Sequence, residues 1–73
     1  MAGLTQSDRV LRHLQDFGSI TPVTALRDYG IMRLGARIWE LKRRGYDIRT
    51  EREEGLNRYG ERTAYARYRM VRG

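Results

Sequence analysis

The sequence predicts an α+β fold in which three helices precede a two-stranded β-hairpin. Apolar residues recur at helical spacing as far as residue 44, and they alternate with polar residues beyond residue 46. At 73 residues, the chain has room for one domain spanning 1–73, whose small core every element must share.

Capping signals mark the expected helices. Thr5, followed three residues later by Asp8, resembles a capping box. Thr21 stands before Pro22, and proline is favoured at the first helical position. Gly45 is free to adopt the left-handed conformation that ends many helices. The expected helices span about residues 6–17, 22–29 and 33–44.

Two runs with a period of two residues predict the hairpin, the first beginning at Tyr46 and the second ending at Val71. The expected strands span about residues 46–52 and 63–71, and a long, polar, mobile loop is expected over 53–62. On the outward face, Arg67 and Arg69 are expected to form ion pairs with charged side chains of the first strand. Residues 19–21 are too few for more than a brief extended segment.

The third expected helix has an apolar side and a cationic side. At 100° per residue, Leu34, Ile38 and Leu41 lie within about 40° of one direction, so this side is expected to face the core. The residues that point roughly the other way are Met32, Ala36, Trp39 and Arg43. Trp39 has two interpretations, as extra core against the hairpin or a helix, or as a contact on the exposed face.

Two further positions of this helix also have two interpretations. Glu40 follows Arg37 by three residues and precedes Arg44 by four, so it is expected to hold both arginines in place, the alternative being direct readout of a cytosine amine. Gly35 lowers helix propensity by about 1 kcal/mol relative to alanine. It also allows the helix backbone to approach a phosphate closely. The sequence leaves both roles of Gly35 open.

The net charge favours a polyanionic partner, and the composition argues against a metalloprotein or an enzyme. Fifteen lysines and arginines against nine acidic residues give a formal net charge of +6, which makes nucleic acid the leading candidate. The sequence has no cysteine and one histidine, His13, which is expected at the surface or its boundary. No metal site, cofactor or catalytic constellation is therefore expected, and the protein is not expected to be an enzyme.

The expected location is the cytoplasm, without a membrane partner. No apolar stretch approaches the ~20 residues that span a bilayer. The first residues, "MAGLTQSDRV", lack the apolar centre of a signal peptide.

The chain resembles a known family over nearly its whole length. The runs "GSITPVTALRDYGIMRLGARIWELKRRGYDI" and "ARYRMV" look like the small winged helix-turn-helix domains of bacteriophage and prophage proteins. The resemblance implies a winged helix-turn-helix fold that binds double-stranded DNA in a bacterial host, close to the nucleoid. It also implies a role as a small transcriptional regulator or a recombination accessory factor, without a cofactor.

The candidate DNA-binding residues fall in three groups. The third helix is expected to enter the major groove, where paired hydrogen bonds from arginine recognise guanine. A threonine pair before and within the second helix could bind a phosphate, although capping alone explains Thr21 equally well. The hairpin loop is expected to reach the flanking backbone or minor groove. The candidates are Arg33, Gly35, Ala36, Arg37, Trp39, Glu40 and Arg43, then Thr21 and Thr24, then Asn57, Arg58, Tyr59 and Arg62.

The sequence also allows a protein, rather than DNA, as the partner. The same scaffold would serve as a protein-binding module that inhibits or redirects a host protein, with Trp39, Met32 and Tyr59 as interface anchors. A homodimer on paired DNA half-sites is also consistent with the sequence, although no separate dimerisation helix is visible.

Overall fold

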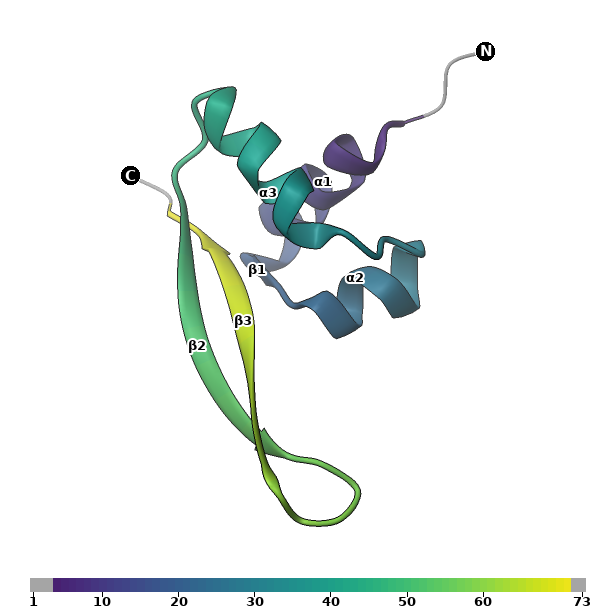
Figure 1. The fold of residues 1–73 in the computed structure, drawn as a ribbon. Helices are drawn as coiled ribbons and strands as arrows, with labels where there is room; N and C mark the ends of the chain where they lie inside the picture. Colours follow the sequence, from purple (N-terminus) through teal and green to yellow (C-terminus); the bar gives the residue numbers. More distant parts are fainter. Residues whose placement is uncertain (1–3, 72–73) are drawn as a thin grey trace.

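A computed structural model describes residues 4–71 of the chain. In chain order the elements are α1 (Gln6–Phe17), β1 (Ser19–Ile20), α2 (Pro22–Tyr29), α3 (Leu34–Arg43), β2 (Ile48–Leu56) and β3 (Arg62–Met70). The helices pack together, and a β2–β3 ribbon projects away from them (Figure 1). The ribbon contributes to a longest dimension of 44 Å.

Side-chain caps fix where α1 and α2 begin. The Thr5 hydroxyl accepts a hydrogen bond from the backbone N–H of Asp8 at 3.1 Å, and the Asp8 carboxylate accepts one from the Thr5 N–H at 3.2 Å. At α2 the Thr21 hydroxyl accepts from the N–H of Thr24 at 3.3 Å, and Pro22 occupies the first turn. Each cap satisfies backbone donors that a helix start leaves without partners, which is worth about 1 kcal/mol.

The core is small and shared among the elements. Its buried apolar residues are Val10, Leu14, Ile20, Ala25, Ile31, Leu34, Ile38, Leu41 and Ile48. Burial of one such side chain contributes about 1.5–3 kcal/mol, so each loss would remove a large part of the net stability of a domain this small. Three of the residues form the inward side of α3, as the helical spacing predicted, and the opposite side of α3 therefore faces outward.

The sheet has three strands, in the order β1-β3-β2, and not the two strands expected. Ser19 lies opposite Arg69 and Ile20 opposite Tyr68, both in antiparallel register. The carbonyl of Gly18 accepts a hydrogen bond from the Met70 N–H at 3.0 Å, which extends the pairing by one position. The short segment after α1 becomes a strand because β3 passes beside it, a contact between distant parts of the chain that local sequence cannot show.

The β2–β3 ribbon is longer than expected, and its loop is shorter. The sequence predicted strands over 46–52 and 63–71 with a loop over 53–62, whereas the strands reach Leu56 and resume at Arg62. The antiparallel register runs on to Leu56 opposite Arg62, and ion pairs on the outward face lie at the inner end of this extension. The Arg67 guanidinium binds the Glu53 carboxylate, which also accepts a hydrogen bond from the Tyr65 hydroxyl at 2.8 Å. Nearer the core, Arg69 Nε lies 2.9 Å from Glu51 Oε1.

The tip is a hydrogen-bonded turn over residues 57–61. The side-chain oxygen of Asn57 accepts from the N–H groups of Tyr59 at 2.9 Å and Glu61 at 3.0 Å. Gly60 has a φ of +77°, in the left-handed region that glycine adopts without steric cost. The polar and glycine residues that predicted a long mobile loop instead close a compact turn.

His13 is buried, which corrects its expected place at the surface or its boundary. Its side chain is 8% exposed, and Nδ1 lies 2.7 Å from the Tyr29 hydroxyl, which joins α1 to α2. The Phe17 ring covers it at a centroid distance of 4.7 Å. A polar group tolerates burial here because its hydrogen bond is made within the protein.

Acidification should destabilise the fold through His13. Burial holds the pKa of His13 below its usual value of 6.5, against the opposing effects of Asp28 and Asp16. Between 6.5 and the lowered native pKa, the unfolded chain binds a proton that the native state does not. The unfolding free energy should therefore fall as the pH falls through this window.

Denaturant titrations between about pH 7.5 and 5.5 measure this effect. His13→Asn keeps a polar group close to the position of Nδ1 and does not titrate, so this variant should lose the pH dependence of unfolding in this range. If the unfolding free energies of wild type and His13→Asn change equally with pH, the assignment to His13 is wrong.

Candidate nucleic-acid interface

The outward side of α3 presents an aromatic ring and cations to solvent. Trp39 is 57% exposed, so of its two interpretations the structure shows the exposed one. The Arg43 guanidinium lies 4.9 Å from the centre of its ring, a cation–π distance that orders both side chains. Ala36, one turn earlier, is partly buried and small enough to leave this side open to a close approach.

The flank of α3 that faces α1 is held by a polar clamp around Glu40. Glu40 Oε1 lies 2.6 Å from Arg37 Nε and accepts a hydrogen bond from the Ser7 hydroxyl at 3.1 Å. Arg44, expected to pair with Glu40 as well, pairs with Asp8 of α1 instead, at 3.6 Å. Glu40 therefore connects two helices, and the expectation that it holds both arginines is wrong for Arg44.

Uncompensated positive charge concentrates at two places. Among residues 4–71, the cationic side chains without a carboxylate partner are Arg9, Arg33, Lys42, Arg43, Arg49, Arg58 and Arg62. Three of these belong to α3 or the residue before it, and two belong to the end of the ribbon. The glutamates of the ribbon's outer face, Glu51 and Glu53, pair with Arg69 and Arg67. At the tip, Glu61 bonds only to Asn57 and offsets part of the positive charge of the two arginines.

The ribbon tip exposes some of its expected binding residues and uses another for structure. Arg58 and Arg62 are exposed, and Tyr59 is 82% exposed. The Asn57 side chain is engaged in the turn, since it accepts from two backbone groups and donates to Glu61 Oε1 at 3.2 Å. The tip therefore presents two arginines, Tyr59 and the exposed Leu56 to solvent.

Residues 5–73 match the family described as "Winged helix-turn-helix domain". The chain belongs to this family. Neither a curated protein nor a solved structure gave a significant match. In this winged helix protein, α2 and α3 form the helix-turn-helix, and the β2–β3 ribbon is the wing.

The two candidate threonines of the winged helix domain, Thr21 and Thr24, are bonded to each other and at least partly buried. Thr21 is only 7% exposed, and its hydroxyl caps α2 and donates to the Thr24 hydroxyl at 3.2 Å. Thr21 is thus occupied within the protein, which fits the capping interpretation rather than phosphate binding. Thr24 is partly buried beside it.

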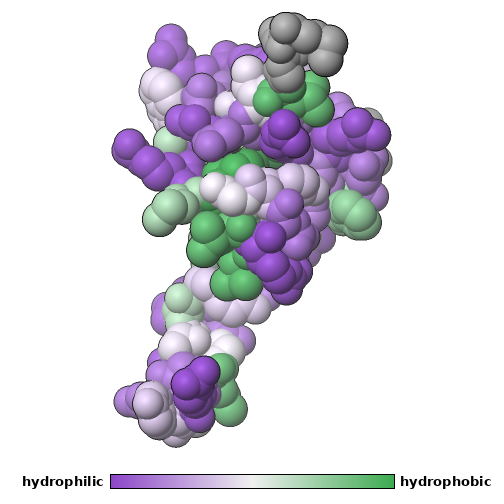
Figure 2. All heavy atoms as spheres, turned by 90° about the vertical axis from the view of Figure 1, so that its right-hand side faces the viewer, coloured by the Kyte–Doolittle hydropathy of each residue, from purple (hydrophilic) through white to green (hydrophobic). Residues whose placement is uncertain are grey.

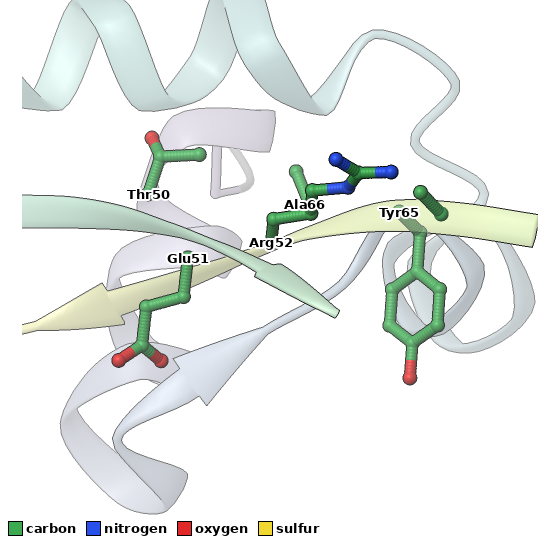
Figure 3. A pocket seen from close by; sticks show the side chains of 6 residues that line it. Thr50, Glu51, Arg52, Tyr65 and Ala66 are labelled. Carbon is green, nitrogen blue, oxygen red and sulfur yellow. The ribbon is translucent and has the colours of Figure 1, made fainter. Parts of the chain in front are cut away.

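The face of the wing nearest α3 contains residues that the sequence did not single out. Tyr68 lies directly opposite Thr50, and Ala66 opposite Arg52. Figure 3 shows Thr50 and Arg52 on the helix side of the wing, with Glu51 and Tyr65 on the other side. Alternation of residue types placed Tyr68 on the inward face, but it could not show that α3 covers only the base of that face.

Gly35 stands where α3 meets this face of the wing. A Cβ at Gly35 would lie 3.7 Å from the Tyr68 hydroxyl oxygen, an ordinary van der Waals distance. The position therefore has room for alanine. Nothing in the packing of residues 4–71 requires a glycine in this turn.

The described part of the winged helix chain was also searched for metal sites and membrane-spanning helices. No group of three histidine, aspartate and glutamate side chains among residues 4–71 is arranged to hold a metal ion. None of the helices in that range is long and apolar enough to cross a membrane.

Gly35→Ala should stabilise the protein. Alanine improves helix propensity by roughly 0.5–1 kcal/mol, and the added methyl group meets no clash. The unfolding free energy from denaturant titration should rise by about this amount. A decrease would mean that the space between α3 and Tyr68 is tighter than the structure shows.

Proposed function

We propose that this winged helix protein binds double-stranded DNA sequence-specifically and acts as a small transcriptional regulator or recombination accessory factor of phage type. In this proposal α3 enters the major groove, the wing follows the flanking backbone, and the protein works in the cytoplasm of a bacterial host. The observation that carries it is the placement of unpaired cations on α3 and at the wing tip. Positive charge on those two surfaces complements the phosphates that line a groove.

The outward side of α3 has suitable chemistry for reading bases. Arg33 and Arg43 have no carboxylate partner within residues 4–71, so their guanidinium groups are free to bond the N7 and O6 atoms of guanine. Ala36 lies between them and would permit contact with a thymine methyl group. Arg37 is held by Glu40, which favours a bracing role over base readout.

The wing supplies contacts of another kind. Arg58 and Arg62 extend from a turn and a strand start, far from the core, and would neutralise phosphates beside the groove that α3 occupies. Exposed Tyr59 would lie against sugar or backbone. Such contacts add affinity and fix orientation without reading sequence.

The direct test is a selection from random-sequence duplex DNA with the purified protein, followed by titrations of the selected site. An enriched motif is expected. Affinity should fall by roughly 10³-fold between about 50 and 200 mM salt if about six phosphates are contacted. Weak binding without an enriched motif, or an affinity that does not depend on salt, would overturn the proposal.

Arginine substitutions should separate α3 from the wing. Arg33→Ala should cost about 1–3 kcal/mol on the selected site and relax discrimination at one base position. Arg58→Ala should weaken all sequences about equally and reduce the salt slope by ~1. Arg12→Ala is the matched control, because Arg12 lies on α1 and pairs with Asp16 of the same helix at 3.9 Å.

These variants are compared by competition against single-base changes in the selected site. If Arg58→Ala changes sequence preference and Arg33→Ala does not, the roles assigned to the helix and the wing are reversed. Equal losses in Arg12→Ala would mean that only net charge matters.

A protein partner is the second candidate function, and an exposed apolar surface favours it. Figure 2 shows apolar side chains gathered in the middle of one face, above the projecting wing. Pro22, Val23, Leu26, Ile31 and Met32 line a hollow of about 220 Å³, and Met32 is 83% exposed. With Trp39 and Tyr59, this surface would anchor a host protein or a second copy of the chain. Loss of partner binding in Met32→Ala, with DNA discrimination retained, would support this candidate.

A further inference from the structure

One edge of β3 has no neighbouring strand over most of the wing. On that side β1 ends at Ile20, which lies opposite Tyr68, and no other strand of residues 4–71 continues the pairing (Figure 1). The hollow of about 290 Å³ beside this edge is lined by Thr21, Val23, Tyr65 and Arg67. The edge of β3 over residues 62–67 is therefore open.

Backbone donors and acceptors of alternate residues point to this open edge. The Asp47 carbonyl accepts a hydrogen bond from the Val71 N–H at 2.9 Å, and the Glu61 carbonyl accepts one from the Asn57 N–H at 3.0 Å. The register between these two bonds is unbroken, so the odd-numbered residues of β3 bond to β2. The N–H and C=O groups that face the other way belong to Arg62, Ala64 and Ala66. Unpaired groups in such a row are a template for another strand.

The two open edges of the wing differ in charge. At the β2 edge, five of the six residues from Arg49 to Glu54 are charged. Charged side chains on an edge strand oppose the addition of another strand. At the β3 edge, residues 63–66, "TAYA", carry no charge. Strand addition is therefore expected at β3 rather than at β2.

We propose that this edge joins two copies of the chain, by antiparallel pairing of β3 with β3 about a two-fold axis at Ala64. Ala64 lies midway between Arg62 and Ala66, so this register uses all the backbone groups that face the open edge. The two copies would form about six backbone hydrogen bonds. The inference goes beyond the proposed function and does not depend on it, because the paired edge is separate from α3.

The side chains are compatible in this register. Thr63 would lie opposite Tyr65 of the second copy, and pairs of a β-branched and an aromatic residue stabilise neighbouring strands. Glu61 would lie opposite Arg67 of the second copy. Among residues 4–71 the Glu61 carboxylate has no cationic partner and accepts a hydrogen bond from Asn57 at 3.2 Å. Pairing therefore adds an attraction at each end of the interface and places no like charges opposite each other.

The paired stretch also ends where the fold requires. Opposite Tyr68 the edge is occupied by Ile20 of β1, so the second copy has to leave the edge after Glu61. Its chain does leave there, because residues 57–61 form the turn at the tip. This turn would lie beside the hollow at the start of α2, where Val23 is 65% exposed. The surface of one copy thus leaves room for the tip of the other.

Sedimentation equilibrium of the purified chain tests the proposal. The interface is small, so monomers and dimers should exchange, and the dimer fraction should rise with protein concentration. Ala64→Pro removes the central N–H of each copy and should raise the dissociation constant by about tenfold or more. The fold should accept this change, since proline is tolerated on an edge strand where its nitrogen faces solvent.

Glu54→Pro is the matched control. Glu54 lies directly opposite Ala64 in the same wing, and its N–H faces the β2 edge instead. The same backbone change on that side should leave the dissociation constant at the wild-type value. A denaturant titration of both variants shows whether each of them remains folded.

A charge exchange at Ala64 tests the register without a change to the backbone. Ala64 is exposed, so a charged side chain at this position leaves the core intact. Ala64→Lys or Ala64→Glu alone would place like charges opposite each other at the axis and should weaken the dimer by several-fold or more. An equimolar mixture of the two variants should dimerise again, because an ammonium group then lies opposite a carboxylate.

The other outcomes contradict the proposal. A chain that stays monomeric up to about 1 mM has no specific interface of this kind. A dimer weakened by Glu54→Pro and not by Ala64→Pro would pair through β2, and one weakened only by Met32→Ala would use the apolar hollow of α2. If the dimer responds as expected and no DNA motif is selected, the β3 edge is an interface and the proposed function alone fails.

Discussion

The rest of the structure depends on the burial of one side of α3. Leu34, Ile38 and Leu41 are 3% exposed or less, and they hold α3 against the other core residues. Rotation of the helix about its axis would expose them, at about 1.5–3 kcal/mol each. The side that carries Trp39 and Arg43 is outward for this reason alone. The side of α3 that forms the candidate binding surface is thus set by packing. The polar clamp between Glu40 and Ser7 fixes the approach of α1 to the same helix.

The local features of the fold could be predicted because they depend on neighbouring residues. The caps at Thr5 and Thr21 and the apolar side of α3 need only spacing along one helix. Features that join distant segments could not be predicted. The pairing of Ser19 with Arg69 spans fifty positions, and the burial of His13 depends on a hydroxyl sixteen residues away. The wing was underestimated because its glycines and polar residues indicated a loop, while the pairing of residues 53–56 with 62–65 depends on the opposite strand.

In the candidate site, too, local features could be predicted and contacts between distant segments could not. Which cations exist is plain from the sequence, but which of them are neutralised depends on tertiary contacts. Arg44 was expected to bond within its own helix and instead reaches Asp8, and Thr21 proved fully engaged as a cap. Net charge favours a class of partner, and the tertiary contacts then narrow which cations are available to it.

The wing and α3 differ in how much of the buried core they carry. The residues of the wing between 49 and 67 contribute none of the buried core, and beyond β1 the wing is a ribbon only two strands wide. Substitutions there change what the tip contacts while the packing of the helices stays intact. The wing is therefore free to diverge quickly under selection for new binding sites. By contrast, α3 commits Leu34, Ile38 and Leu41 to the core and, in the proposed function, its opposite side to DNA, so its ten residues are constrained from both directions.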